Sequence, residues 1–272
     1  MRFKSSFVRL TAAVIAPSVY AEQQNATAIQ QKIFRTLLAK GATTDFGKEH
    51  LFASIKTYED FKAAVKIRDY EGLSDYIDLI ADGKENVLWQ GKPLYFCKSS
   101  GTTSGTKYIP VTKEQIDEMI KAARNSLMMY VAETGKADFF NHPMIFLQGS
   151  PALDVHGKIP AGRLSGIVYH HVPFYARANR MPSYNINCID DWETKVEAIA
   201  LETLQKKMSL ISGIPPWVVM YFEKLKQLSG KQFIKDIFPQ FQLFAHGGVN
   251  YEPYRNKIES LIGFKIDTVE TY

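Results

Sequence analysis

The chain has 272 residues, of which 46% are hydrophobic, 12% aromatic and 22% charged, and these proportions exclude a disordered or fibrous protein. Its 33 basic and 28 acidic side chains leave a net charge of +5, without the basic stripe that nucleic-acid binding requires. No apolar run approaches the ~18 to 20 residues of a membrane-spanning helix. The two cysteines, Cys97 and Cys188, stand far apart and belong to no Cys/His spacing, which argues against a disulfide framework or a structural zinc site. We therefore expect no nucleic-acid partner and no membrane partner, while the oligomeric state is not set by the sequence.

The N-terminal segment 1–27 has two interpretations. Three basic residues precede the apolar stretch LTAAVIAPSVYA, a pattern that resembles a secretory signal cleaved after Ala21. Pro17 and Tyr20 inside the apolar stretch favour the alternative, an N-terminal helix that packs on the domain. We therefore expect a cytoplasmic protein, exported only if residues 1–21 are a signal peptide.

Hydrophobic spacing and turn residues place the remaining elements in chain order. Thr57 is the expected N-cap of a helix, and Thr112 opens a capping-box pattern. Pro215 and Pro216 fit the first turn of a further helix. The expected helices are 28–38, 57–65, 74–81, 112–133, a helix from Asp191 to about Lys207, 214–228 and 251–262. The expected strands are 93–98, 108–112, 144–147, 241–245 and 264–269, with turns alone between 148 and 182. Strand, helix and strand in succession predict an α/β fold with parallel pairing in the last third.

The segment Ser99–Lys107, SSGTTSGTK, is the most informative part of the sequence. Its glycines allow successive backbone N–H groups to point at one anion, its hydroxyl groups add donors, and Lys107 adds a positive charge. This composition is typical of a polyphosphate-binding loop. A solvent-exposed Ser/Gly hairpin is the competing interpretation of the same residues.

Known catalytic loops fit this segment less well. A Walker loop is excluded because Thr106 separates Gly105 from Lys107. The Ser-x-x-Lys spacing of Ser104 and Lys107 requires a helix, which Gly105 and the following Tyr-Ile-Pro oppose. A glycine- and serine-rich amidase loop, which also places serines near a lysine, stays open as an alternative.

Four segments occur together in a characteristic order: SSGTTSGTKYIPVT, SGIPPWVVMYFEKL (212–225), AHGGVNYEPYR (245–255) and VETY (269–272). In order and spacing the chain resembles the Gretchen Hagen-type acyl acid amido synthetases, the auxin-responsive family within the adenylate-forming enzymes. The resemblance runs from about residue 28 to the end. It implies an α/β fold in which 28–272 form an incomplete large adenylation domain, with helices packed on mixed β-sheets. It also implies a truncated chain that lacks the mobile C-terminal domain.

The resemblance also implies a nucleotide site. The loop would grip the ATP phosphates through Ser99, Ser100, Gly101, Thr102, Thr103, Ser104, Gly105 and Lys107, although it is one residue shorter before its lysine than the plant pattern. Gly247 and Gly248 would run along the adenine and the acyl group. Tyr272 would begin the second motif, Tyr-x-x-Ser-Glu, whose remaining residues lie beyond the chain, as does the third motif with its ribose-binding aspartate.

For the acyl pocket we consider Arg124, as a partner for a carboxylate, together with Gly213, Ile214 and Trp217. A solvated arginine and a core tryptophan are equally consistent with the positions of Arg124 and Trp217. The sequence contains no catalytic triad and no cluster of metal ligands, so it assigns no catalytic side chain and no metal ligand.

The reaction implied by the resemblance consumes ATP, with Mg²⁺ accompanying its phosphates. A carboxylate attacks the α-phosphorus and expels pyrophosphate, after which an amine or amino acid attacks the acyl adenylate to form an amide. Positioning and charge stabilisation account for most of such catalysis. As a fragment, the chain is expected to be inactive alone. The alternatives are an amidase-type hydrolase and a non-catalytic nucleotide-binding remnant. The acid and the amine are not specified by the sequence.

Overall fold

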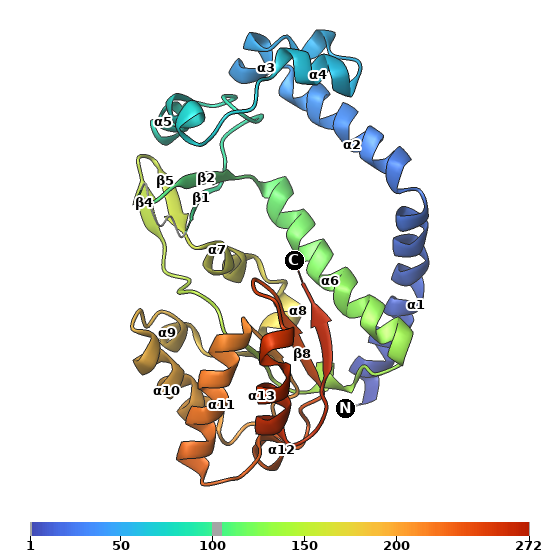
Figure 1. The fold of residues 1–272 in the computed structure, drawn as a ribbon, viewed down its shortest axis with the longest axis vertical. Helices are drawn as coiled ribbons and strands as arrows, with labels where there is room; N and C mark the ends of the chain where they lie inside the picture. The colour runs from blue at the N-terminus through green and yellow to red at the C-terminus, as the bar shows by residue number, and fades with distance from the viewer. Residues whose placement is uncertain (1, 100–104, 272) are drawn as a thin grey trace. The chain divides into compact units, whose positions relative to one another are not determined.

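A computed structural model describes residues 2–99 and 105–271 of the chain. These residues form two compact units (Figure 1). The five-stranded unit comprises residues 1–18, 119–151 and 168–272, and the four-stranded unit comprises 19–118 and 152–167. Three boundaries between the units fall within α1 (Arg2–Gln24), α6 (Lys113–Thr134) and α7 (Leu164–His171), and the fourth lies between residues 151 and 152. Within the described residues, no helix has both the length and the apolar content needed to span a bilayer.

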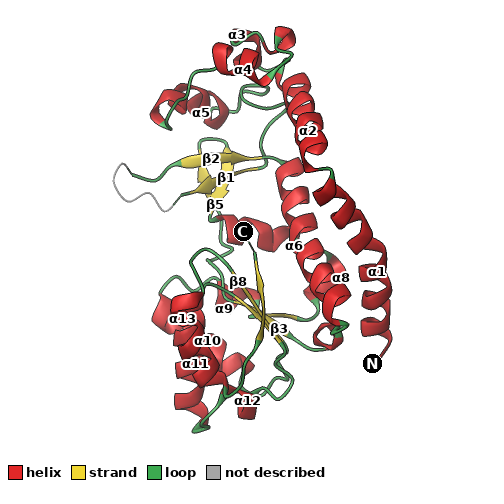
Figure 2. Cartoon of the chain, turned by 45° about the vertical axis from the view of Figure 1, so that its right-hand side comes forward, coloured by secondary structure: helices red, strands yellow, loops and turns green. Residues whose placement is uncertain are grey.

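The four-stranded unit is built on a mixed sheet in the order β2-β1-β5-β4. Figure 2 labels its strands β1, β2 and β5. Its strands are β1 (Tyr95–Lys98), β2 (Tyr108–Val111), β4 (Asp154–His156) and β5 (Ile159–Gly162). Strands β1 and β5 are parallel, whereas the β1–β2 and β4–β5 pairs are antiparallel. Lys98 pairs with Tyr108, so the segment 99–107 connects the two strands of a hairpin.

Short helices surround this sheet, and local hydrogen bonds explain where they begin. The side chain of Thr57 accepts from the backbone of Asp60, which closes the capping box of α4 (Tyr58–Ala64). Thr44 caps α3 (Asp45–Glu49) by accepting from the backbone of Gly47 at 3.0 Å. The other helical segments of this unit are α2 (Ala26–Gly41), the 3₁₀ turns Phe52–Ser54 and Glu71–Leu73, and α5 (Ser74–Ala81).

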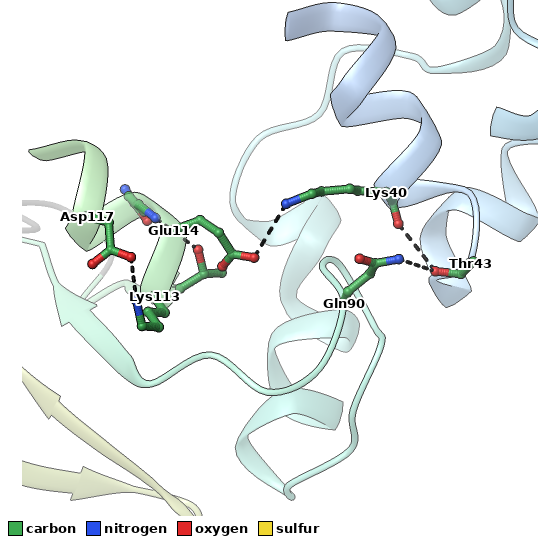
Figure 3. Close-up of polar contacts among 8 residues, drawn as sticks. Lys40, Thr43, Gln90, Lys113, Glu114 and Asp117 are labelled. Atoms are coloured by element: carbon green, nitrogen blue, oxygen red, sulfur yellow. Dashed lines mark hydrogen bonds and ion pairs between the residues drawn. The ribbon is translucent and has the colours of Figure 1, made fainter. Parts of the chain in front are cut away.

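Polar contacts connect α2 with the start of α6 (Figure 3). The ammonium of Lys40 lies 3.6 Å from a carboxylate oxygen of Glu114, and the amide of Gln90 donates to the hydroxyl of Thr43 at 3.1 Å. All of these side chains are at the surface, where single ion pairs contribute little to stability. Beneath the strands, the core of this unit gathers around the fully buried ring of Phe96.

The five-stranded unit contains an entirely parallel sheet in the order β6-β3-β7-β8-β9. Its strands are β3 (Met144–Phe146), β6 (Arg180–Met181), β7 (Leu210–Ser212), β8 (Leu243–His246) and β9 (Asp267–Glu270). Successive side chains of a strand point to opposite faces, and both faces are covered. Met144, Leu210 and Leu243 join a core with residues of α1 and α6, whereas their neighbours Ile145, Ile211 and Phe244 join a second core with residues of the helices on the other face.

The helices of that second core group together on one side of the strands (Figure 1). They are α10 (Trp192–Thr203), α11 (Pro215–Ser229) and α13 (Glu252–Ile262). The remaining short segments are the 3₁₀ turn Asp138–Asn141, α8 (Phe174–Arg177), α9 (Tyr184–Asn187) and α12 (Ile234–Ile237).

The structure confirms the α/β class and the parallel pairing in the last third, and it corrects several boundaries. The region 148–182, predicted as turns alone, contains β4, β5, α7, α8 and β6. The helix predicted to reach about Lys207 ends at Thr203. The last strand begins at Asp267 rather than 264, because its pairing with β8 begins only at Asp267, after the left-handed Gly263 (φ 89°) and residues 264–266. These differences change none of the motif positions.

Candidate functional site

The carboxyl edge of the parallel sheet, in the five-stranded unit, is one candidate site. Because all five strands run in the same direction, the turns that follow them lie at one edge. The chain leaves β3 toward β6 on one side and leaves β7 toward β8 on the other, so the topological switch point lies between β3 and β7. Open α/β sheets bind ligands at the carboxyl ends of their strands, at such a point. Gly213 and Ile214 follow β7, and Gly247 and Gly248 follow β8.

Close backbone approaches account for the glycines at this edge. A Cβ atom on Gly213 would lie 2.9 Å from Cβ of Leu147, which follows β3. A Cβ atom on Gly247 would collide with the carbonyl oxygen of Thr271, which follows β9. Gly248 has a φ of 79°, and a Cβ atom there would lie 3.1 Å from Cγ2 of Ile214. Three of the predicted residues, Gly213, Gly247 and Gly248, thus shape adjacent turns, and Ile214 lies beside them.

Two buried polar side chains at this edge have unused hydrogen-bonding atoms. His246, the last residue of β8, is 4% exposed, and its ring stacks on that of Tyr251 with centroids 4.5 Å apart. Among the described residues, neither Nδ1 of His246 nor the hydroxyl of Tyr251 has a hydrogen-bond partner. Burial lowers the pKa of His246, which favours the neutral imidazole. Burial likewise raises the pKa of Tyr251, so both rings are neutral groups near pH 7.

Neither residue was predicted from the sequence as a site residue. The available signal was the polar His246 at the end of the apolar run Leu-Phe-Ala (243–245), directly before two glycines. A polar residue at the carboxyl end of a buried parallel strand is a recognised indication of a ligand site.

A buried lysine holds the turn after β3. Lys195 of α10 is 2% exposed, and its ammonium donates to the backbone carbonyl of Gln148 at 3.1 Å and to that of Asn187 at 2.5 Å. Charge-assisted hydrogen bonds of this kind are about twice as strong as neutral ones. They fix the turn after β3, beside the switch point, because Gln148 follows β3 by two residues.

The two other residues considered for the acyl pocket lie in different surroundings. Trp217 is half-buried on α11 and stacks on Trp192 at a centroid distance of 4.3 Å, against the core between helices and sheet. Arg124 is exposed on α6, where its guanidinium donates to the side-chain oxygen of Asn125 at 2.9 and 3.2 Å. Their assignment to an acyl pocket stays a prediction.

The base of the hydroxyl-rich loop, in the four-stranded unit, is a second and separate candidate site. Ser100, Gly101, Thr102, Thr103 and Ser104 lie outside the described residues, as does Tyr272 in the other unit. The remaining loop residues extend the hairpin, since the backbone N–H of Ser99 donates to the carbonyl of Lys107 at 2.9 Å. Gly105 has a φ of 88°.

Aromatic rings surround the end of this loop. The ammonium of Lys107 lies 5.5 Å from the ring centroid of Tyr70. The hydroxyl of Tyr70 accepts a hydrogen bond from the backbone N–H of Tyr108 at 3.0 Å. On its ring, Tyr108 stacks against His156 with centroids 3.7 Å apart. At the end of the loop, Lys107 thus contacts Tyr70, and Tyr108 contacts both Tyr70 and His156.

The described residues do not form a metal site. Within residues 2–99 and 105–271, no three His, Cys, Asp or Glu side chains are close enough together to hold an ion. The carboxyl edge of the sheet holds two buried polar rings, whose Nδ1 and hydroxyl atoms have no partner among the described residues.

Solved structures share this architecture. The acyl acid amido synthetase AtGH3.15 in complex with 2,4-DB matches 97% of this chain and 55% of its own length, with a TM-score of 0.77 at 12% identity. An open conformation of 2-hydroxyisobutyryl-CoA ligase, in complex with 2-HIB-AMP and CoA, matches 85% of this chain and 50% of its own, with a TM-score of 0.52 at 12% identity. The fold is therefore that of the corresponding region of adenylate-forming ligases.

Sequence comparison defines the family. The family described as "GH3 family N-terminal domain" matches residues 18–187 and 139–265. The jasmonoyl-L-amino acid synthetase JAR4 of Nicotiana attenuata is 26% identical over 157 residues, which are 56% of this chain and 26% of the relative. The probable indole-3-acetic acid-amido synthetase GH3.1 of Arabidopsis thaliana is 30% identical over 96 residues, which are 35% of this chain and 16% of the relative.

The chain belongs to the GH3 family, as its motifs indicated. It spans about half the length of the solved synthetase that it matches.

Proposed function

We propose that this chain provides ATP- and acyl-binding surfaces of an ATP-dependent acyl acid amido synthetase. The observation that carries the proposal is the family match over residues 18–187 and 139–265. The parallel sheet with its switch point, and the loop that closes the β1–β2 hairpin, are consistent with it. An amide ligase of this kind needs a carboxylic acid, ATP and an amine or amino acid.

Each of the two candidate sites has its own role in the proposal. The loop 99–107 binds the phosphates of ATP through backbone N–H groups, hydroxyl groups and Lys107. At the carboxyl edge of the sheet, the turns of Gly213 and Gly247 bind the adenine and the acyl group through their backbone. The unused atoms of His246 and Tyr251 supply polar contacts there, because a hydrogen bond to a buried polar atom without a partner is favourable.

The proposed reaction has two steps. A carboxylate oxygen attacks the α-phosphorus of ATP, and the bond to the bridging oxygen breaks to release pyrophosphate. The amine then attacks the acyl carbon, which forms the amide and releases AMP and a proton. The contribution of this chain is to orient the reactants and to stabilise charge, which are the main sources of rate in such chemistry. Mg²⁺ is expected to bind with the phosphates, and no step is assigned to a metal ligand of the described chain.

The first test is ATP binding by the 272-residue chain, measured by titration calorimetry in the presence of Mg²⁺. The double variant Ser100→Ala, Thr102→Ala removes two proposed donors. A hydrogen bond to a charged group contributes about 1.5–3 kcal/mol, so the loss of either donor alone weakens binding at least tenfold. The matched control is Thr36→Ala, Ser260→Ala, which removes two exposed helix hydroxyls and leaves the affinity unchanged.

Two outcomes would contradict the proposal, and a further assay tests the ligase chemistry. Unchanged affinity in the double variant would show that the loop is only a hairpin. If the wild-type chain hydrolyses simple amides, and the same double variant loses this activity but still binds ATP, the amidase alternative is favoured. Pyrophosphate release with a panel of carboxylic acids then tests the ligase chemistry. We expect it from a protein that continues through the second and third motifs and not from residues 1–272 alone.

A further inference from the structure

Tyr70 contacts two successive residues at the end of the hydroxyl-rich loop, Lys107 and Tyr108. Its ring lies below the ammonium of Lys107, 5.5 Å from nitrogen to centroid, and its hydroxyl accepts the backbone N–H of Tyr108 at 3.0 Å. Tyr70 precedes Lys107 by 37 positions and lies outside the hairpin that carries the loop. The contact is therefore a tertiary one.

Packing and a backbone hydrogen bond anchor Tyr70 in the four-stranded unit. Its ring packs at the margin of the small core formed by residues such as Phe96 and Ile80. Its carbonyl accepts the backbone N–H of Leu73 at 2.9 Å, which fixes the start of the 3₁₀ turn Glu71–Leu73. A side chain anchored in this way can hold a flexible one, and Lys107 has four rotatable side-chain bonds.

We propose that Tyr70 is a positioning residue for Lys107, which sets the lysine for contact with the phosphates of the nucleotide. The inference rests on the function proposed above. The π face of Tyr70 attracts the ammonium at a distance within the range of cation–π interactions, about 6 Å. Because the lysine is then ordered before the nucleotide arrives, less rotamer entropy is lost on binding. The hydroxyl of Tyr70 fixes the backbone at the same place, so that the lysine emerges from a defined position.

Two further contacts lie beside this pair. Ser99 and Lys107 are joined by a backbone hydrogen bond of 2.9 Å, which brings the two ends of the loop together. The ring of Tyr108 stacks on that of His156 with centroids 3.7 Å apart. The hairpin and Tyr70 together thus set the position from which Lys107 emerges.

The test is a double-mutant cycle on ATP affinity in the 272-residue chain. Tyr70→Leu removes both contacts and is expected to weaken binding of ATP about two- to tenfold, the cost of ordering one long side chain. Tyr70→Phe keeps the ring and removes only the hydroxyl, and it is expected to retain most of the affinity. In a Lys107→Met background, Tyr70→Leu is expected to have no further effect, because the side chain that it positions is absent. Tripolyphosphate is expected to repeat the pattern, whereas adenosine binding should not change.

The possible results separate this inference from the proposed function. If the wild-type chain binds neither ATP nor tripolyphosphate, both are wrong. If it binds ATP and Tyr70→Leu binds equally well, or loses the same factor with and without Lys107, Tyr70 has at most a structural role and the inference is overturned. Should Tyr70→Leu fail to fold, as judged by circular dichroism, Tyr70→Met enters the same cycle, because it fills more of the ring volume and has no π face.

Discussion

Replacement of Gly247 by alanine should destabilise the five-stranded unit more than a typical glycine substitution. The new Cβ atom would collide with the carbonyl oxygen of Thr271, a backbone atom that can move only with the end of β9. Such overpacking costs about 1–3 kcal/mol. Moving Thr271 also breaks its backbone hydrogen bond to the carbonyl of His246, 2.7 Å long, at a cost of about 1 kcal/mol. We expect a loss of roughly 2–4 kcal/mol in the free energy of unfolding.

The measurement is urea unfolding followed by tryptophan fluorescence in a Trp89→Phe background. The two remaining tryptophans, Trp192 and Trp217, both belong to the five-stranded unit and report on its unfolding. The matched control is Gly230→Ala, because Gly230 has a φ of 67° and no atom lies within 4 Å of the position that a Cβ atom would take there. That control incurs only left-handed strain, about 1–2 kcal/mol. If Gly247→Ala lowers the free energy of unfolding no more than the control does, the inferred close approach of Thr271 to Gly247 is refuted.

Two further predictions concern buried side chains. Thr44 is 1% exposed, and its hydroxyl bridges the backbone of Gly41 and Gly47. Thr44→Ala should therefore lower the free energy of unfolding by about 1–2 kcal/mol and speed hydrogen exchange of the Gly47 amide. Thr44→Ser keeps the hydroxyl and should retain most of the stability. Burial lowers the pKa of His246 below the ordinary value of about 6.5, so the unfolded chain binds a proton that the folded chain does not. The free energy of unfolding should therefore fall as the pH drops from 7.5 through 6.5 toward the folded pKa and level off below it. Urea unfolding at pH 7.5 and 5.5 tests this, and the same pH dependence in His246→Asn would contradict it.

Elements with strong local signals were predictable from the sequence. Thr57 is the expected N-cap of α4, where its side chain accepts from the backbone of Asp60, and Pro215 lies in the first turn of α11, because both effects depend on residues within one helical turn. The strands on either side of the hydroxyl-rich loop were likewise predicted, because a short apolar run bounded by glycine and serine favours a strand.

The short strands between residues 148 and 182 were not predictable. β4, β5 and β6 have three, four and two residues, and each exists only because it pairs with a distant segment. The pairing of β6 with β3, for example, joins Arg180 to Met144. A pattern of alternating side chains needs more residues than these strands contain. The strand order, and with it the switch point between β3 and β7, depends on the same distant pairings.

The candidate site was predictable only in part, for a related reason. Glycines mark the turns at the carboxyl edge, but the fold itself requires Gly213 and Gly247, because other backbone segments approach them closely. Their presence alone is therefore weak evidence for a ligand. His246 and Tyr251 are stronger evidence, since burying a polar atom without a partner lowers the stability of the fold. A ligand that hydrogen-bonds to those atoms would offset this cost, so the most informative residues at the edge are the two that sequence motifs did not identify.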